Sequence, residues 1–169
     1  MFKTWWFTNI RRNEFVSFDN QSDDKGGLYI SVPNARKHTD PLRFEFNKAY
    51  DFMPFVNKDL CLEFEVKTSQ NNFNLNVYFM DSLDDSLGKK GYEWRASYSF
   101  SNKDKLNDGK WHKVRIPLKD MKDGGTWNEA EQKWYNGEGL FTWKRIGQLR
   151  FNFTEDLTEE CCFRNIVIR

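Results

Sequence analysis

Hydrophobic and polar residues alternate along short segments of this chain, with the period of two that is typical of β-strands. In the segment DLCLEFEVKT, leucine, phenylalanine and valine occupy every second position from Leu60 to Val66, and mostly charged residues lie between them. The same alternation recurs at residues 73–80, 112–118 and 149–154. Each segment would bury one face and expose the other, so these four strands predict a β-sandwich.

Other short apolar segments extend the same pattern along the chain. Turn-forming sequences such as DDKGG, NDGK and KDGG separate several of these segments. About nine or ten strands in total fit a jelly roll or a closely related sandwich. We therefore predict an all-β fold, a two-sheet antiparallel β-sandwich of the jelly-roll type, in a single domain spanning residues 1–169. The further strands are expected at residues 14–19, 27–32, 42–46, 92–100 and 162–168.

The polar positions of the predicted strands combine amides, carboxylates, a guanidinium and a ring. Sugar hydroxyls pair with planar polar groups, and the apolar face of a pyranose packs on a ring, so this mixture suits a sugar-binding surface. The alternative is that these residues simply face water, as polar residues of any antiparallel sheet do. The residues concerned are Glu63, Glu65, Asn74, Asn76, Tyr78, Arg150 and Asn152.

The segment YEWRASYSF, residues 92–100, has aromatic rings at alternate positions. Strand periodicity predicts that these rings enter the core, which leaves Glu93 and Arg95 beside the polar surface residues. In the opposite register, Trp94 and Tyr98 would instead form the surface on which a sugar packs.

One segment carries a helical signal. Thr126 is followed three residues later by a glutamate, which fits a capping box, and Trp127, Ala130 and Trp134 would share one face of a two-turn helix. We expect both tryptophans to be structural rather than a ligand platform. Tyr135 would point elsewhere and is the ring of this segment left for a ligand, and Trp143 should be buried because it precedes a core strand.

Composition and charge limit the function classes. The 169 residues suffice for one sizeable core, and 17% of them are aromatic although the mean hydropathy is −0.83. The 26 basic and 25 acidic residues are mixed along the chain, which argues against a nucleic-acid-binding surface. No apolar run reaches the roughly 18 residues of a membrane-spanning helix, and the N-terminal sequence lacks the features of a signal peptide, so we expect a soluble chain without membrane contact.

Metal and thiol chemistry have few candidates. Three cysteines, Cys61, Cys161 and Cys162, are too few for a disulfide framework or a zinc site, although Cys61 could pair with one of the other two. The loop DNQSDDKGG, residues 19–27, holds three carboxylates that could bind a structural calcium ion through oxygen. No cofactor is expected apart from this calcium, and His112 is expected to be a core or strand-end residue.

Glu63 and Glu65 also raise an enzymatic alternative. Two carboxylates two positions apart on one strand face would lie about 6.8 Å apart, near the separation in inverting glycosidases. Nothing in the surrounding sequence indicates the apolar pocket that a general acid needs. We therefore expect a protein that is not an enzyme, with a small jelly-roll hydrolase or lyase as the less favoured reading.

The C-terminal half resembles galactose-binding-like β-sandwich carbohydrate-binding modules, which accompany secreted polysaccharide hydrolases. The resemblance rests on DGKWHKVRIPLKDM, GTWNEAEQKWYNGEGLFTWKRIGQLRF and CCFRNIVIR, and the match spans about 60 of the 169 residues. The family pattern has an acidic residue before the final Asn-Ile, where this chain has Arg164, and this departure weakens the case for calcium. The matching positions are Trp111, Ile116, Pro117, Leu118, Trp127, Trp134, Phe141, Trp143, Ile146, Leu149 and Phe151.

The resemblance implies a non-catalytic module, acting as a monomer, that binds a plant cell-wall polysaccharide of the β-glucan, xyloglucan or mannan type along a concave sheet or at the loop tips. It also implies an extracellular location and a covalently linked glycoside hydrolase. The alternative is an intracellular assembly protein of the same fold. The predicted ligand-binding residues are Tyr78, Asn74, Asn76, Glu63, Glu93, Arg95, Arg150, Asn152 and Tyr135.

Overall fold

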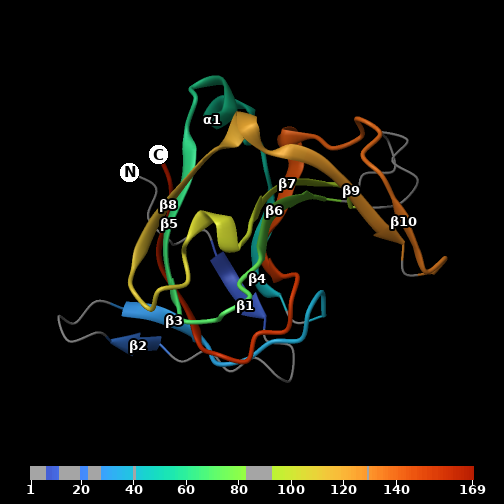
Figure 1. The fold of residues 1–169 in the computed structure, drawn as a ribbon. Coiled ribbons are helices and arrows are strands. Elements are labelled where there is room, and N and C mark those ends of the chain that lie inside the picture. The colour runs from blue at the N-terminus through green and yellow to red at the C-terminus, as the bar shows by residue number, and fades with distance from the viewer. Residues whose placement is uncertain (1–6, 12–19, 23–27, 40, 83–92, 129) are drawn as a thin grey trace.

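Two antiparallel β-sheets pack against each other around an aromatic core (Figure 1). The computed structural model describes residues 7–11, 20–22, 28–39, 41–82, 93–128 and 130–169. The predicted all-β sandwich is confirmed.

The large sheet has seven strands in the order β1-β4-β11-β6-β7-β9-β10. Its strands are β1 (Phe7–Arg11), β4 (Leu42–Tyr50), β11 (Ile146–Phe153), β6 (Leu75–Asp81), β7 (Arg95–Phe100), β9 (Lys122–Asn128) and β10 (Lys133–Tyr135).

The small sheet has five strands in the order β2-β3-β12-β5-β8. Its strands are β2 (Asn20–Ser22), β3 (Leu28–Val32), β12 (Cys161–Ile168), β5 (Cys61–Thr68) and β8 (His112–Pro117). Short helical elements connect the strands: α1 (Met53–Asn57), η3 (Asn102–Asp104), η4 (Leu118–Asp120) and η5 (Trp143–Arg145).

Phenylalanine rings fill the space between the sheets. The ring of Phe64 on β5 meets the ring of Phe151 on β11 edge-on, with 5.0 Å between their centres. Phe151 also lies 4.9 Å from Phe163 on β12, so one aromatic cluster links both sheets. Burying each such side chain contributes about 1.5–3 kcal/mol to folding, which explains how a chain of low mean hydropathy forms a core.

The strand predictions agree with the structure wherever it describes the chain. β3, β7 and β12 lie within one to three residues of their expected limits, and β4 extends four residues further than expected. Residues 14–19 lie outside the described residues. Trp94 and Ala96 are buried as the alternation predicted, so the register assigned to residues 92–100 is confirmed for these two positions.

The helix predicted around Trp127 and Trp134 is wrong, because this segment is a β-hairpin of β9 and β10. The side-chain oxygen of Asn128 accepts hydrogen bonds from the backbone N–H groups of Ala130 and Glu131, which starts a turn instead of a helix. The Thr126 hydroxyl donates to the backbone carbonyl of Glu93 on the neighbouring chain segment, at 2.7 Å. The short helix of the fold is α1 instead.

The three cysteines are free thiols and all are buried, so Cys61 does not pair with either of the others. Burial raises the pKa of Cys162 to about 12, and it raises the pKa of Cys161 as well. These two thiols therefore stay protonated at neutral pH and are poor nucleophiles.

The described residues contain no cluster of three or more His, Cys, Asp or Glu side chains that could hold a metal ion. The loop proposed for calcium, residues 19–27, falls mostly outside the described residues, and calcium binding there stays a prediction. Within the same described ranges, the helices are too short or too polar to span a membrane.

Candidate functional site

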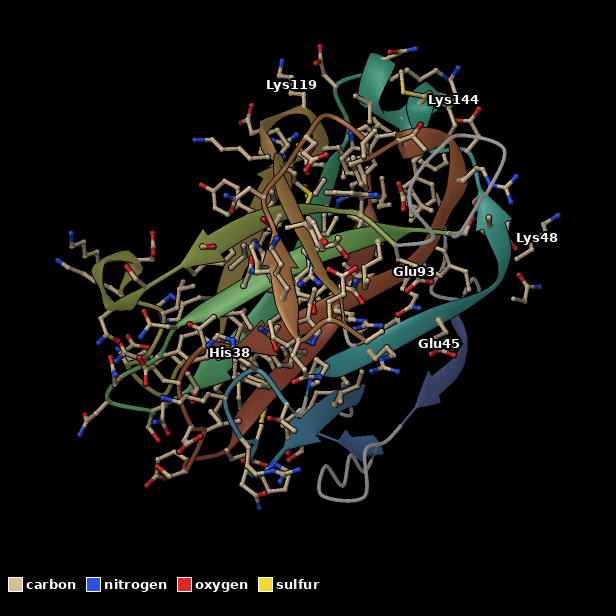
Figure 2. All side chains as sticks on the ribbon, turned by 90° about the vertical axis from the view of Figure 1, so that its right-hand side faces the viewer. His38, Glu45, Lys48, Glu93, Lys119 and Lys144 are labelled. Atoms are coloured by element: carbon tan, nitrogen blue, oxygen red, sulfur yellow. The ribbon has the colours of Figure 1, made fainter. Side chains whose placement is uncertain are left out.

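The outer face of the large sheet gathers most of the residues that the sequence predicted for a site. Arg150 on β11 lies opposite Tyr78 on β6, and Asn152 lies opposite Asn76 on the same two strands. These residues share one face because directly paired residues of antiparallel strands point the same way. We call this surface, which faces the viewer in Figure 2, the large-sheet face.

Arg95 joins this face because its neighbour is locked into the core. The Trp94 side chain is fully buried, and its backbone N–H donates to the buried carboxylate of Asp81 at 2.9 Å. Successive strand residues point to opposite sides, so Arg95 is directed outward as predicted.

The guanidinium of Arg95 lies between two aromatic rings. Its central carbon is 4.6 Å from the ring centre of Tyr78 and 4.7 Å from that of Trp134 on β10. Arg95 Nε is the one buried side-chain nitrogen or oxygen without a hydrogen-bond partner among the described residues, so the ring faces dominate its surroundings. Cation–π contacts of this kind contribute about 0.5–2 kcal/mol each, depending on exposure. The stack fixes Trp134 above the large-sheet face.

Two glycines on β9 let this stack form. A Cβ atom on Gly124 would lie 2.6 Å from the Ser97 hydroxyl and 3.3 Å from Arg95 Cγ, in the space that the Arg95 stem occupies. Gly125 has φ +76°, and its Cβ would meet the backbone oxygen of Tyr135 at 2.1 Å. Because β9, which lies between β7 and β10, has no side chains at these two positions, the Arg95 side chain can extend across it to Trp134.

The exposed rings are not those that the sequence favoured. Trp127 and Trp134 are 42% and 43% exposed, and they lie directly opposite each other on one side of the hairpin. Tyr78 lies on the predicted face but is only 3% exposed, because Arg95 covers it. Tyr78 is therefore a buried support and not an open stacking surface. The expectation that Trp127 and Trp134 are structural is wrong as regards their burial.

Tyr135 is also placed differently from the prediction. It neighbours Trp134 on β10, so its ring points to the opposite side of the hairpin. There it is half-buried, its hydroxyl donates to the Glu131 carboxylate, and the Lys133 ammonium lies 4.9 Å from its ring centre. Trp143, expected to be buried, packs against the core 5.5 Å from the Phe79 ring but is only partly buried.

Arginines and glutamates form the polar part of the large-sheet face. Gln148 accepts two hydrogen bonds from Arg150, at 2.8 and 2.6 Å, and Arg43 lies 3.6 Å from the Glu45 carboxylate. Arg43 lies directly opposite Arg150 on the neighbouring strand, and burial lowers the pKa of Arg43 while repulsion by Arg150 lowers it further. The face therefore presents fixed donors and acceptors side by side.

Glu93 lies beside these charges, near Glu45 in Figure 2. Burial raises the pKa of Glu93. The negative charges of Asp81 and Glu45 raise this pKa further, whereas the positive charge of Arg150 lowers it. A half-buried carboxyl with a raised pKa can both accept and, when protonated, donate a hydrogen bond.

We expect Glu93→Gln to stabilise the fold at pH 8. Because the pKa of Glu93 is higher in the folded state than its ordinary value of 4.5, ionising it destabilises the fold as pH rises through the raised pKa. Melting curves at pH 8 should show a gain of about 2–4 °C, and this gain should vanish near pH 4. The exposed Glu159→Gln is the control, and an equal gain at both pH values would contradict the account.

The remaining amides sit at one end of the face. Asn76 accepts a hydrogen bond from the Ser99 hydroxyl at 3.4 Å, and Asn152 is mostly buried. Asn74 lies just before β6, where its side chain donates to Asn72 at 3.1 Å. The structure thus brings six predicted residues together, with Asn74 at the margin: Asn76, Tyr78, Glu93, Arg95, Arg150 and Asn152.

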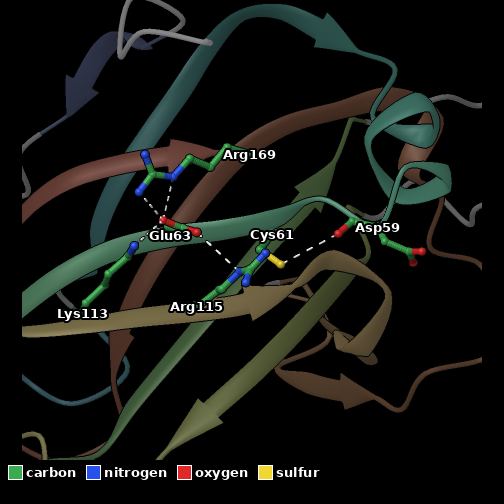
Figure 3. A network of polar contacts seen from close by, with 6 residues as sticks. All are labelled: Asp59, Cys61, Glu63, Lys113, Arg115 and Arg169. Carbon is green, nitrogen blue, oxygen red and sulfur yellow. Dashed lines mark hydrogen bonds and ion pairs between the residues drawn. The ribbon is translucent and has the colours of Figure 1, made fainter.

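Glu63 does not belong to this face. It lies on β5 in the small sheet, on the opposite side of the sandwich, where three cations surround its buried carboxylate (Figure 3). Arg169 contacts it at 2.7 and 2.8 Å, Lys113 at 3.1 Å and Arg115 at 3.4 Å. Strand alternation identifies an outward residue but not the sheet that carries it. This is why the prediction that Glu63 shares a face with Tyr78 and Arg150 was wrong.

The ion pairs on the small sheet also remove the enzymatic alternative. Glu65, the second carboxylate of the proposed pair, is bound by Arg164. Hydrogen bonding from Arg169 lowers the pKa of Glu63, whereas a general acid needs a raised pKa. His112, the first residue of β8, also has a carboxylate partner, because its Nε2 lies 2.6 Å from the Asp108 carboxylate.

Sequence reasoning missed several residues of the site, namely Arg43, Glu45, Gln148, Trp127 and Trp134. Arg43 and Glu45 alternate with Leu42, Phe44 and Phe46, so the pattern of β4 already marked them as outward. The two tryptophans were found but assigned to a helix.

Comparisons with known proteins agree with this fold. Residues 4–169 match the family described as carbohydrate binding domain 30. A solved family 30 carbohydrate-binding module aligns over 91% of this chain and 82% of its own, with TM-score 0.65 and 17% identity. No curated protein matches the chain.

Two modules from Clostridium thermocellum share the fold. A family 30 module of a cellulosomal cellulase has 14% identity and TM-score 0.60, over 92% of this chain and 82% of that one. A family 11 module, solved in complex with a β-1,3-1,4-mixed-linked tetrasaccharide, has 14% identity and TM-score 0.59, over 89% and 80%. The resemblance to carbohydrate-binding modules is confirmed, as is the expectation of a protein that is not an enzyme. The match over residues 4–169 shows that this chain belongs to carbohydrate-binding module family 30, a family of non-catalytic β-sandwich modules.

Proposed function

We propose that this module binds a β-linked glucan chain across the large-sheet face. The observation that carries the proposal is the pair of exposed rings, Trp127 and Trp134, held beside a face of half-buried arginines and glutamates. The family 11 relative solved with a β-1,3-1,4-mixed-linked tetrasaccharide supports a mixed-linked glucan over xyloglucan or mannan. Family membership favours glycan binding over the intracellular assembly role that the fold alone left open.

The two tryptophans would supply the apolar contacts. Packing one pyranose on one ring removes roughly 60 Å² of apolar surface from water, which stabilises the complex by about 1.5 kcal/mol. Micromolar binding corresponds to about −8.2 kcal/mol, so two rings provide less than half of the required free energy. The rest has to come from hydrogen bonds along several sugar residues, which suits an open face and an internal segment of a polysaccharide.

The charged residues would supply those hydrogen bonds. Arg150 and Arg43 carry planar donors, and Glu45 and Glu93 carry acceptors, at positions set by paired strands. Sugar hydroxyls donate and accept at once, so a guanidinium beside a carboxylate can bind two neighbouring hydroxyls. Because β4 and β11 hold these groups rigidly, little conformational entropy is lost on binding.

We further propose that the module targets a linked glycoside hydrolase to its substrate outside the cell. The family 30 relative from Clostridium thermocellum belongs to a cellulosomal cellulase, which supports this role. A structural calcium ion in the loop at residues 19–27 stays part of the proposal, and chelator-dependent melting would reveal it.

Affinity electrophoresis against a panel of soluble polysaccharides tests the proposed ligand. We expect the module to be retarded most by mixed-linkage β-glucan and less by xyloglucan and galactomannan, with bovine serum albumin as the unretarded reference. Equal mobility in every gel would overturn the proposed function, and stronger retardation by galactomannan would overturn the choice of ligand.

A further inference from the structure

A concave surface lies on the outer side of the small sheet, away from the large-sheet face. It is a groove of about 250 Å³ beside the network of Figure 3. This volume is near the lower end of small-molecule sites, which run from roughly 300 to 1,000 Å³, and leaves room for one sugar ring. The lining residues are Glu63, Phe64, Glu65, Lys113, Asn165, Val167 and Arg169.

Two cations and two carboxylates line this groove, and two further arginines, Arg115 and Arg164, pair with those carboxylates from beside it. Arg169, Lys113 and Arg115 all share the one carboxylate of Glu63. Each guanidinium has five N–H donors and the ammonium has three, whereas a carboxylate offers about four lone-pair sites. Glu63 therefore cannot take up all of these donors. Two positions further along β5, Glu65 forms an ion pair with Arg164.

The shared cations remain open to solvent. The side chains of Lys113, Arg115 and Arg169 are 56%, 64% and 62% exposed, although the Glu63 side chain that holds them is only 8% exposed. The buried carboxylate thus holds two exposed cations, Lys113 and Arg169, at the groove and a third, Arg115, beside it, and their charge attracts an anion.

Other lining residues suit a sugar ring rather than a small inorganic ion. Val167 lies opposite Glu63 on β12 and provides an apolar contact beside the charges. Asn165 has φ +54° at an irregularity between Arg164 and Val167, which places its exposed side-chain amide at the groove. An amide, a carboxylate and an apolar surface together form the setting that sugar hydroxyls and a pyranose face require.

We propose that this groove is a second glycan site, which binds an acidic sugar residue of an anionic polysaccharide, such as a hexuronate. The sugar carboxylate binds Lys113 and Arg169, the pyranose packs against Val167, and Asn165 and Glu65 bind hydroxyl groups. An acidic protein surface is the other chemistry that fits the charge. The small concave volume favours the sugar, because specific protein interfaces bury about 800 Å² per partner.

Titration with sodium tetragalacturonate at low salt, followed by NMR, tests this site in the whole chain. We expect dissociation constants on the order of millimolar, because one or two exposed ion pairs and one ring contact contribute little. Lys113→Gln should weaken binding at least about threefold, from loss of roughly 0.7 kcal/mol. Lys119→Gln is the matched control, since Lys119 is equally exposed at 56% but pairs one to one with Asp59 at 2.8 Å. Unchanged mixed-linkage β-glucan binding by Lys113→Gln would show that its fold is intact.

Four results would overturn the proposal. Equal binding of the fully methyl-esterified tetrasaccharide would show that the charge is irrelevant. An equal loss in Lys113→Gln and Lys119→Gln would indicate general attraction of polyanions. Loss of tetragalacturonate binding in the Trp127→Ala/Trp134→Ala variant would place the acid on the large-sheet face. Tighter binding of tetraglutamate would favour an acidic protein partner.

Discussion

The variant Trp127→Ala/Trp134→Ala is expected to bind mixed-linkage β-glucan about a hundredfold more weakly than the native chain. Each ring contributes about 1.5 kcal/mol by covering one face of a pyranose, and loss of both removes about 3 kcal/mol. Folding stability should fall by only about 0.5–2 kcal/mol, the contribution of the Arg95–Trp134 contact, because both rings are otherwise more than 40% exposed on an edge hairpin. Isothermal titration calorimetry and a urea unfolding curve measure the two effects separately.

Tyr98→Ala is the control for these rings. Tyr98 is 37% exposed, an exposed fraction similar to that of the two tryptophans. It lies opposite the core residue Val77 and therefore points away from the large-sheet face. Its removal should leave glucan affinity within about twofold. Native-like affinity in the double tryptophan variant, or an equal loss in Tyr98→Ala, would contradict the assigned face.

Tyr78→Ala is expected to lower the free energy of unfolding by about 3 kcal/mol, the lower end of the cost of removing a buried aromatic ring. The ring is 3% exposed, and its loss leaves the Arg95 guanidinium without one of its two aromatic contacts. Urea unfolding followed by tryptophan fluorescence measures this cost. Glucan affinity should also fall, because Arg95 no longer holds Trp134 in position.

Tyr78→Phe separates the ring from the hydroxyl. It keeps the ring on which Arg95 packs and loses only the hydroxyl, so its free energy of unfolding should fall by no more than about 1 kcal/mol. A loss below 1 kcal/mol in Tyr78→Ala would mean that the ring is an exposed stacking surface after all, as the sequence alone had suggested.

Local alternation in the sequence was enough to predict which residues point outward. Asn76, Tyr78, Arg150 and Asn152 were all assigned to one outer face, and the strand pairing of β6 with β11 confirms it. Alternation has no information about which sheet a strand joins, since that depends on pairing between distant segments. Glu63 was misplaced for this reason: β5 pairs with β8 and β12.

The hairpin shows a second limit of local patterns. Trp127 and Trp134 are seven residues apart, a spacing that suits one face of a helix as well as a cross-strand pair. The turn at Asn128 decides between them, because its side chain binds two backbone N–H groups. Coverage of Tyr78 by Arg95 could not be predicted either, as it depends on glycines at positions 124 and 125 of a strand that was not expected.

The two sides of the sandwich therefore differ in chemistry. The large-sheet face combines exposed indoles with half-buried arginines and glutamates, which suits a neutral chain of sugars. The groove on the small sheet combines solvent-exposed cations with the apolar side chain of Val167, which suits an acidic sugar. A module with both could contact a neutral glucan and an anionic polysaccharide at the same time.

The most direct test of the central claim is an NMR titration of the chain with a mixed-linkage β-glucan tetrasaccharide. We predict that the indole N–H signals of Trp127 and Trp134, identified from the single alanine variants, shift together with backbone signals of Arg150 and Asn76. Signals of Lys113 and Arg169 on the small sheet should stay in place. Shifts confined to the small sheet, or unchanged signals from both indoles at saturating ligand, would contradict the assignment of the glucan to the large-sheet face.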